Sequence, residues 1–336
     1  MIHYDPRWAG AHGIGRFSQE VISRLEDAHP VEIGVRKLSL LDPLATTLAV
    51  RRLRSGAYFT PGFNPPLRCP VSFVFCIYDL IHLHFPAQST PLRRAYYRLV
   101  VRPGARRAAR VLTISEYSRN SILEWSGLPP ERVEIAGCGV AQVFKPEGPR
   151  HDPGYPYFLF VGRREPHKNI ARLLAGYAGS RCRNDIRLLF TGPPDPVTEA
   201  QVRGRGLDAQ VVFSPVLSDA ELAACYRGAV ALAFPSLYEG FGLPIAEAMA
   251  CGTPVLTSDV TAIPETMGAD NALIVDPMRI ESIADGLDRL AAGSALCSTL
   301  RERGLLRARE FSWQQVANRV RDVLLAAQSQ DAQKKA

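Results

Sequence analysis

One stretch constrains the fold of this chain more than any other, from Ala229 to Asp259 (AVALAFPSLYEGFGLPIAEAMACGTPVLTSD). It starts with a short apolar run that is typical of a buried parallel strand. A turn containing Gly240 and Gly242 follows, and Pro244 stands where helices favour proline, at the first helical position. Gly252 ends the helix, and a second apolar run resumes. The order strand, glycine loop, helix, strand predicts an α/β fold in which backbone N–H groups face a phosphate.

Two carboxylates frame this loop, Glu239 before it and Glu247 inside the helix, with the spacing E-x7-E. A carboxylate at the mouth of the loop can accept hydrogen bonds from sugar hydroxyls, and one on the helix can hold the two hydroxyls of a ribose. A diphosphate between them would lie at the positive end of the helix dipole. Taken singly, each Glu also fits an ordinary solvated residue of a turn or first helical turn.

The length of 336 residues suffices for two α/β domains, each with its own core. No apolar run approaches transmembrane length, and the start MIHYDPRW does not resemble a signal peptide. The seven cysteines are odd in number and form no C-x-x-C pair. This usage indicates reduced, mostly structural thiols in a cytoplasmic protein, and no zinc site.

The positive charge is concentrated in the first half of the chain. Residues 1–150 hold 20 Lys and Arg against 12 Asp and Glu, and the remainder holds 20 against 21. Such asymmetry suggests that one domain faces an anionic partner, either nucleic acid or a membrane.

Most of this charge falls between Asp79 and Glu116, where no acidic residue occurs and arginines alternate with aromatic and aliphatic residues. The pattern is typical of a helix on anionic lipid headgroups, and equally of a solvated helix packed on a sheet. Pro103-Gly104 predicts two short helices here. The candidate membrane-surface residues are Arg93, Arg94, Arg98 and Arg102.

Two further features of the first half concern ligand binding. Gly13 and Gly15 form a glycine turn leading into a helix, which suits a phosphate or the polar end of a substrate, although it does not match the dinucleotide fingerprint. The apolar run from Val71 ends at Asp79. Because ligands bind beyond the carboxyl ends of parallel strands, Asp79 is a candidate to face a cleft.

The second half opens after a linker rich in proline and glycine, residues 146–156. The strand that follows ends at Gly162, and Arg163 and Lys168 come directly after it. Two cations at the carboxyl end of a strand can neutralise a diphosphate leaving group. A surface ion pair is the alternative for either residue alone.

The string FPSLYEGFGLPIAEAMACGTPVLTSDVTAIPE resembles the signature block of the retaining glycosyltransferases of family 4. GIGRFSQEV and YDLIHLHFP resemble other family segments, but Tyr78 stands where the family usually has histidine, so the role of that histidine stays open. The likeness is strongest from Val161 to Asp276. It implies an α/β protein of the GT-B fold, with two Rossmann-like domains facing a central cleft.

The domains expected from this resemblance are an acceptor domain, a donor domain and a C-terminal segment. Residues 1–150 form the acceptor domain and residues 151–311 the nucleotide-sugar donor domain. Residues 312–336 form a helix that crosses back to the first domain and ends in a frayed tail, opened by the capping box of Ser312.

The resemblance also implies roles for single residues. Glu239 would contact the transferred sugar, Arg163 and Lys168 the leaving phosphate, and Asp79 would be a catalytic helper. The expected donor-binding residues are Gly13, Gly15, Val216, Leu217, Phe241, Gly242, Leu243 and Glu247. The backbone around Val216 would lie beside the base, and N–H groups of the glycine loop would stabilise the phosphate. The sequence contains no D-x-D, which agrees with a site that needs neither metal nor cofactor.

The sequence therefore predicts a retaining, metal-independent transfer of a hexose or deoxyhexose from a nucleotide-diphosphate sugar, with mannose from GDP-mannose as first choice. The expected acceptor is a saccharide, lipid-linked, in bacterial polysaccharide or O-antigen biosynthesis. The expected location is cytoplasmic and peripheral, on the anionic inner face of the cytoplasmic membrane.

Two alternatives remain open. One is an epimerase or phosphorylase of the same fold, which the E-x7-E block fits less well. The other is a nucleic-acid-binding protein that uses the basic half. Since the arginines cluster in one window and no nucleic-acid module is recognised, no nucleic-acid partner is expected.

Overall fold

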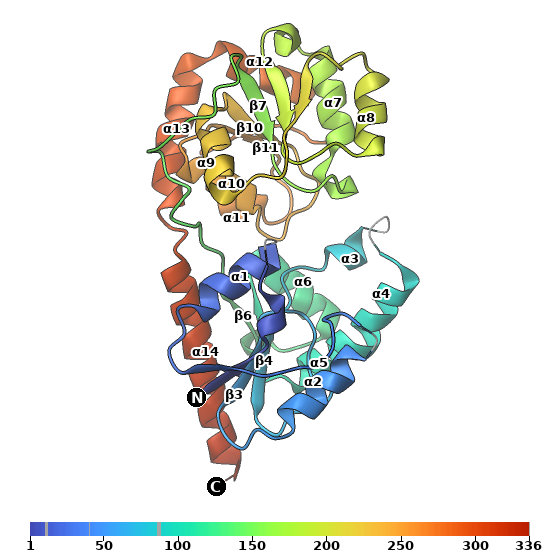
Figure 1. Cartoon of the computed structure of the whole chain (residues 1–336), viewed down its shortest axis with the longest axis vertical. Coiled ribbons are helices and arrows are strands. Elements are labelled where there is room, and N and C mark those ends of the chain that lie inside the picture. Colours follow the sequence, from blue (N-terminus) through green and yellow to red (C-terminus); the bar gives the residue numbers. More distant parts are fainter. Residues whose placement is uncertain (11–12, 40, 86–88, 336) are drawn as a thin grey trace. The chain divides into compact units, whose positions relative to one another are not determined.

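The computed structural model describes residues 1–10, 13–39, 41–85 and 89–335, with side chains of the last helix described as far as Gln330. The chain divides into two compact units (Figure 1). Unit 1 comprises Met1–Gly139 and Ser312–Ala336, and unit 2 comprises Val140–Phe311. The predicted boundary followed residue 150. The structure puts the break at Gly139, so the proline-rich segment 146–156 lies within unit 2.

Unit 1 is built on a six-stranded sheet with the order β2-β1-β3-β4-β5-β6, and every pairing is parallel. Its central strands are buried, as expected where helices cover both faces of a parallel sheet. The strands are β1 (Ile2–Tyr4), β2 (Ala28–Pro30), β3 (Ala57–Thr60), β4 (Ser72–Cys76), β5 (Arg110–Thr113) and β6 (Val133–Ile135).

The helices of unit 1 come from both ends of the chain. From the N-terminal part come α1 (Gly13–Ile22), α2 (Asp42–Val50), α3 (Ile81–His84), α4 (Pro91–Tyr96), α5 (Arg102–Arg107) and α6 (Glu116–Ser126), with short helices η1 (Pro6–Trp8), η3 (Tyr97–Val101) and η4 (Pro130–Arg132). From the C-terminal part comes α14 (Trp313–Lys335).

Helix α14 completes the core of unit 1. Its buried residues Trp313, Val320 and Leu324 share one apolar cluster with Phe17 of α1 and Phe59 of β3. The segment expected to cross back therefore lies with the N-terminal residues, in the same compact unit.

The arginine-rich segment forms α4 and α5, joined by the π-helical turn η3. Pro103 lies in the first turn of α5, directly after the helical residues of η3, and it has no N–H to donate to the preceding turn. The predicted interruption at Pro103-Gly104 is wrong: α4, η3 and α5 follow one another without a break, and residues 91–107 form one helical run that contains a π turn.

Unit 2 is built on a second parallel sheet with the order β12-β11-β10-β7-β8-β9. Its strands are β7 (Tyr157–Phe160), β8 (Arg187–Phe190), β9 (Val211–Phe213), β10 (Ala231–Phe234), β11 (Val255–Thr257) and β12 (Leu273–Ile274). Its helices are η5 (Pro166–Lys168), α7 (Ile170–Gly179), η6 (Arg181–Asn184), α8 (Pro196–Arg203), α9 (Asp219–Gly228), α10 (Leu243–Ala250), α11 (Ile263–Met267), α12 (Ile280–Ala292) and α13 (Ser294–Ala308).

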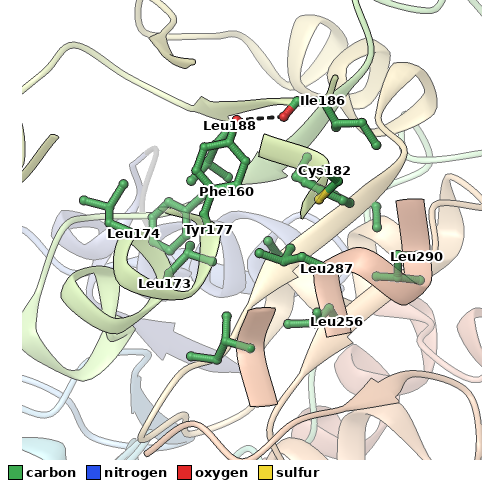
Figure 2. Packing of buried hydrophobic residues seen from close by; sticks show 14 of the residues in the cluster. Phe160, Leu173, Leu174, Tyr177, Cys182, Ile186, Leu188, Leu256, Leu287 and Leu290 are labelled. Atoms are coloured by element: carbon green, nitrogen blue, oxygen red, sulfur yellow. Dashed lines mark hydrogen bonds between the residues drawn. The ribbon is translucent and has the colours of Figure 1, made fainter. Parts of the chain in front are cut away.

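One face of this second sheet is covered by α7 and α12, which meet over a cluster of buried apolar residues (Figure 2). Tyr177 of α7 is fully buried there, and its hydroxyl donates to the backbone oxygens of Ile186 at 2.7 Å and Arg183 at 3.0 Å. The phenol therefore fills the core and also fixes the turn that enters β8.

Two parallel six-stranded sheets, each covered by helices, confirm the predicted α/β fold with two Rossmann-like domains. The seven cysteines are free, as predicted. Within the described residues, no helix combines the length and apolar character that a membrane crossing requires.

Candidate active site

The site is built on the predicted strand, loop, helix and strand, which the structure confirms as β10, the loop 235–242, α10 and β11. Gly242 precedes α10 with φ +92°, a conformation that favours glycine. No side chain caps this helix. The first N–H groups of a helix have no acceptor within it, so this end can bind an anion.

At the mouth of the loop, Lys168 and Glu239 form a nearly buried ion pair. The Lys168 ammonium lies 2.7 Å from Glu239 Oε1, and their side chains are 12% and 10% exposed. The Ser236 hydroxyl donates to the same oxygen at 2.7 Å. The ammonium also lies 4.6 Å from the centre of the Phe234 ring. The structure thus brings together one predicted cation and one predicted carboxylate.

Backbone contacts hold these two residues together although they are far apart in sequence. The N–H of Leu237 donates to the carbonyl of His167 at 2.7 Å. The buried amide of Asn169 donates to the carbonyls of Pro235 at 3.0 Å and Pro277 at 2.6 Å. Asn169 adopts φ +60°, which asparagine tolerates better than most residues. These bonds fix the turn η5 against the glycine loop.

The neighbouring arginines have different roles. Arg163 is exposed and follows Gly162, whose φ of +127° requires glycine and whose Cα lies beside the Lys168 side chain. Arg164 instead donates to the carbonyls of Thr191 and Gly192, and burial lowers its pKa. Arg163 is therefore accessible to a ligand, whereas Arg164 fixes the next loop.

Thr261 supports Glu239 from the far side of the site. Its hydroxyl accepts from the Glu239 N–H at 2.9 Å and donates to the Glu239 carbonyl at 3.1 Å. Thr261 has φ +56°, an unusual value for a β-branched residue. Strained backbone of this kind gathers at functional sites, where the surroundings hold it in place.

Glu247 lies in α10 and is only 4% exposed. The hydroxyl of Tyr226, from α9, donates to its Oε2 at 3.1 Å. The buried position excludes the solvated-helix interpretation of this residue. A carboxylate held by a fully buried tyrosine is fixed in orientation, as recognition of a ribose requires.

The remaining donor-binding candidates of unit 2 lie at the same edge of its sheet. Val216 follows β9 and is 82% exposed, while Leu217 packs partly on the core. Phe241 is buried, and its ring meets Phe311 edge-on at 5.5 Å. Leu243 is the first residue of α10.

Two of the candidates of unit 1, Gly15 and Asp79, have structural contacts of their own. A Cβ on Gly15 would collide with the carbonyl of Gly10, whereas a Cβ on Gly13 would meet open space. Asp79 follows β4, and its Oδ1 accepts the N–H of Ile81 at 3.0 Å, which stabilises the start of α3. The close backbone approach explains Gly15 without a ligand.

The candidate membrane-surface arginines, from α4, η3 and α5, differ in exposure. Arg93, Arg94 and Arg98 are exposed, and Arg102 is partly buried. Leu92 and Leu99 are exposed beside them, at 68% and 69%. The surface therefore combines cations with apolar side chains.

Four residues at the site were not predicted from the sequence: Ser236, Thr261, Asn169 and Tyr226. Ser236 lies within the quoted loop, three residues before Glu239, and is the one that spacing could have indicated. The other three act through long-range contacts or unusual backbone conformations. Among the residues that the structure describes, no group of three His, Cys, Asp or Glu is placed to hold a metal ion.

Comparison with known proteins agrees with the fold and the glycine loop described above. Residues 143–307 match the family described as Glycosyl transferases group 1. O-antigen chain mannosyltransferase B of Escherichia coli is 29% identical over 289 residues, covering 82% of this chain and 75% of that protein. MMP alpha-(1->4)-mannosyltransferase of Mycolicibacterium hassiacum is 34% identical over 235 residues, which cover 68% of this chain and 57% of that protein.

Solved structures agree on the fold. Anabaena Alr3699/HepE, in complex with UDP and glucose, superposes with a TM-score of 0.77 at 15% identity, covering 97% of this chain and 99% of that one. WaaG, a glycosyltransferase involved in lipopolysaccharide biosynthesis, superposes with a TM-score of 0.75 at 17% identity. The superposition covers 96% of this chain and 99% of that one. At such identities the likeness shows the GT-B fold.

The solved structures thus show the GT-B fold, and the family match together with the relatives named above supports the class of protein, a glycosyltransferase. Residues 143–307, which match the Glycosyl transferases group 1 family, carry the glycine loop and both glutamates. The resemblance to family 4 found in the sequence is confirmed.

Proposed function

We propose that this chain transfers a hexose or deoxyhexose from a nucleotide-diphosphate sugar to a saccharide acceptor, in bacterial polysaccharide or O-antigen biosynthesis, with mannose from GDP-mannose as the first candidate. One observation carries the proposal: the Lys168–Glu239 pair at the mouth of the loop that leads into α10. The mannosyltransferase names of the relatives support the choice of sugar.

The proposed reaction retains the configuration of the sugar. The bond from the anomeric carbon to the phosphate oxygen breaks, and a bond to the acceptor oxygen forms on the same face. The departing phosphate takes the acceptor proton, so no separate base is needed. Lys168, Arg163 and the N–H groups at the start of α10 stabilise the charge on the phosphate. Since these groups supply the positive charge, the reaction requires no metal.

The proposed roles of the two glutamates follow from their surroundings. Glu239 contacts the transferred sugar, oriented by Ser236 and Thr261. Glu247 holds the ribose, oriented by Tyr226. The base lies beside the exposed backbone after β9, near Val216.

A calorimetric panel of GDP, UDP, dTDP and ADP tests the donor site. We expect tight binding of one nucleotide to the wild type and a loss of about tenfold or more in Glu247→Gln, since a charge-assisted hydrogen bond contributes about 1.5–3 kcal/mol. Glu199→Gln, an exposed glutamate of α8 in the same unit, is the matched control. If no nucleotide binds, or if both variants behave alike, the donor site is not where we propose.

Turnover assays test the chemistry. With the nucleotide sugar of the base found by calorimetry, the anomeric configuration of the product follows from its proton NMR coupling. Retained configuration, at a rate unaffected by EDTA, is expected. Inverted configuration would exclude front-face displacement, and loss of activity with EDTA would contradict metal independence.

The acceptor is proposed to be lipid-linked and the chain to act as a peripheral protein on the inner face of the cytoplasmic membrane. The exposed arginines of α4 and η3, with Leu92 and Leu99 beside them, support this proposal. Changing Arg93, Arg94 and Arg98 to Gln should weaken sedimentation with anionic liposomes and leave nucleotide binding unchanged. The matched control changes three exposed arginines elsewhere in unit 1, namely Arg36, Arg51 and Arg52. Equal sedimentation of both triple variants would favour a solvated helix.

A further inference from the structure

A cavity of about 570 Å³ lies in unit 1, at the amino ends of three neighbouring strands. It is lined by residues that precede or begin β4, β5 and β6, together with Gln330 of α14. The catalytic candidates follow the carboxyl ends of strands instead, as Asp79 follows β4. A five-residue strand spans roughly 16 Å, so the cavity and Asp79 lie at opposite edges of the sheet.

The charge of this cavity is uniformly positive. Five arginines line it: Arg68, Arg106, Arg107, Arg110 and Arg132. None of the lining residues in the described part of the chain is acidic. Two glutamates lie near the lining: Glu134 pairs with Arg110 at 2.9 Å and is 43% exposed, and the charge of Glu131 acts on Arg132. Guanidinium groups stay protonated in proteins, so the five arginines outnumber these two glutamates and the lining keeps an excess of positive charge.

The arginine cluster is partly fixed in position. Arg132 donates to the backbone oxygens of Arg106, at 3.2 Å, and of Ala108. Burial and the charge of Arg110 lower the pKa of Arg132, against a smaller opposing effect of Glu131, and partial desolvation lowers the pKa of the otherwise exposed Arg107. These like charges are held together by the fold although they repel one another, and a bound anion would relieve the repulsion.

The lining also narrows the class of ligand. Besides the arginines, it offers the polar side chains of Cys69, Ser72 and Gln330, together with backbone and mostly small apolar groups. Its one aromatic residue, Phe73, is only 4% exposed and belongs to the apolar core. The lining therefore exposes no aromatic ring on which a base could stack, whereas phosphate oxygens match the guanidinium forks.

From this geometry we infer a second anion site in unit 1, separate from the donor site, that binds clustered phosphate groups through Arg68, Arg107 and Arg132. The same phosphate chemistry can come from a soluble polyphosphate or from a phosphorylated lipid headgroup. The proposal does not depend on the identity of the sugar donor, because no residue of the donor site takes part.

The experiment titrates inorganic tripolyphosphate into the full-length protein by calorimetry. Because the donor site can also bind phosphate, the titration is repeated with Lys168→Met, in which the binding should persist. In the double variant Arg68→Gln/Arg107→Gln it should weaken about tenfold or more, since each charged hydrogen bond contributes about 1.5–3 kcal/mol. Both arginines are exposed, so circular dichroism should show an unchanged fold.

The matched control is Arg36→Gln/Arg203→Gln, which removes two exposed charges elsewhere and should bind as the wild type does. Equal affinity of wild type and Arg68→Gln/Arg107→Gln, or an equal loss in the control, would overturn the proposal. Loss of binding in Lys168→Met would assign the tripolyphosphate to the donor site and overturn it too.

Vesicles of phosphatidylcholine with phosphatidic acid distinguish the two sources of phosphate. Sedimentation that falls in Arg68→Gln/Arg107→Gln but not in the control supports the site with a headgroup as ligand. Tripolyphosphate binding without a change in sedimentation supports the site with a soluble ligand.

Discussion

Replacing Lys168 by Met tests both the stability and the chemistry of the site. The ammonium and Glu239 Oε1 are 2.7 Å apart and nearly buried. With an effective dielectric constant of about 20, their attraction amounts to ~6 kcal/mol before the cost of desolvation. Removing one partner of a buried pair typically costs about 3–5 kcal/mol, because the other charge is left buried.

For unit 2, with its 172 residues from Val140 to Phe311, a loss of 3 kcal/mol corresponds to a decrease in Tm of roughly 6–12 °C. Differential scanning calorimetry measures this directly. The double variant Lys168→Met/Glu239→Gln removes both charges, and we expect it to recover most of the loss. Lys145→Met, an exposed lysine of the same unit, is the matched control and should leave Tm unchanged.

Activity should respond differently from stability. Lys168→Met should lower kcat about 100- to 1,000-fold through lost stabilisation of the leaving phosphate. The double variant should stay as inactive, since neither substitution restores the cation. A double variant as unstable as the single one would refute the argument from an unpaired buried charge. Wild-type turnover in Lys168→Met would refute its role at the phosphate.

Three further substitutions test other parts of the structure. Tyr177→Phe removes the hydroxyl that is shared between the backbone oxygens of Ile186 and Arg183, and should lower the free energy of unfolding by about 1–3 kcal/mol, measured by urea denaturation. Gly242→Ala, at φ +92°, should cost about 1–3 kcal/mol in the same assay, whereas Gly179→Ala, whose Cβ would meet open space, should not destabilise. In the folded protein, burial and then the charge of Arg93 lower the pKa of His82 below its ordinary value of 6.5. The unfolded chain therefore takes up the proton first as the pH falls. The stability that neutral His82 contributes is present above pH 6.5 and is lost as the pH falls through the folded pKa. The decrease in Tm on going from about pH 7.5 to about pH 5 should therefore be smaller in His82→Gln, and an equal decrease would contradict the assignment.

The sequence predicted the backbone of the site better than its side-chain contacts. The stretch from Ala229 to Asp259 contains residues that mark the ends of its elements, since glycines and Pro244 determine where the loop and the helix begin. The predicted strand, loop and helix are therefore confirmed. The partner of Glu239, by contrast, comes from 71 residues earlier in the chain. Its placement depends on how η5 packs, which no local pattern encodes.

The supporting residues show the same limit. Tyr226 is an ordinary aromatic residue of α9 in the sequence, and only the packing of α9 against α10 brings its hydroxyl to Glu247. Thr261 adopts a backbone conformation that threonine disfavours, so residue propensities would not predict this conformation at position 261. The domain boundary was predicted from the proline-rich composition of residues 146–156. The structure instead breaks at Gly139, because Val140 and Phe144 already pack on the core of unit 2.

The packing of α14 has a consequence for the order of folding during synthesis. Unit 1 cannot complete its apolar core until Trp313, Val320 and Leu324 have been made, although its sheet ends at Ile135. At 5–20 residues per second, the 188 residues between Gly139 and Ala327 take roughly 10–40 s to translate. Unit 2, with all its strands contiguous, can fold during that time. Unit 1 is thus the first unit to be synthesised and the second to complete its fold. Its exposed apolar surface must stay protected from aggregation until α14 has been synthesised.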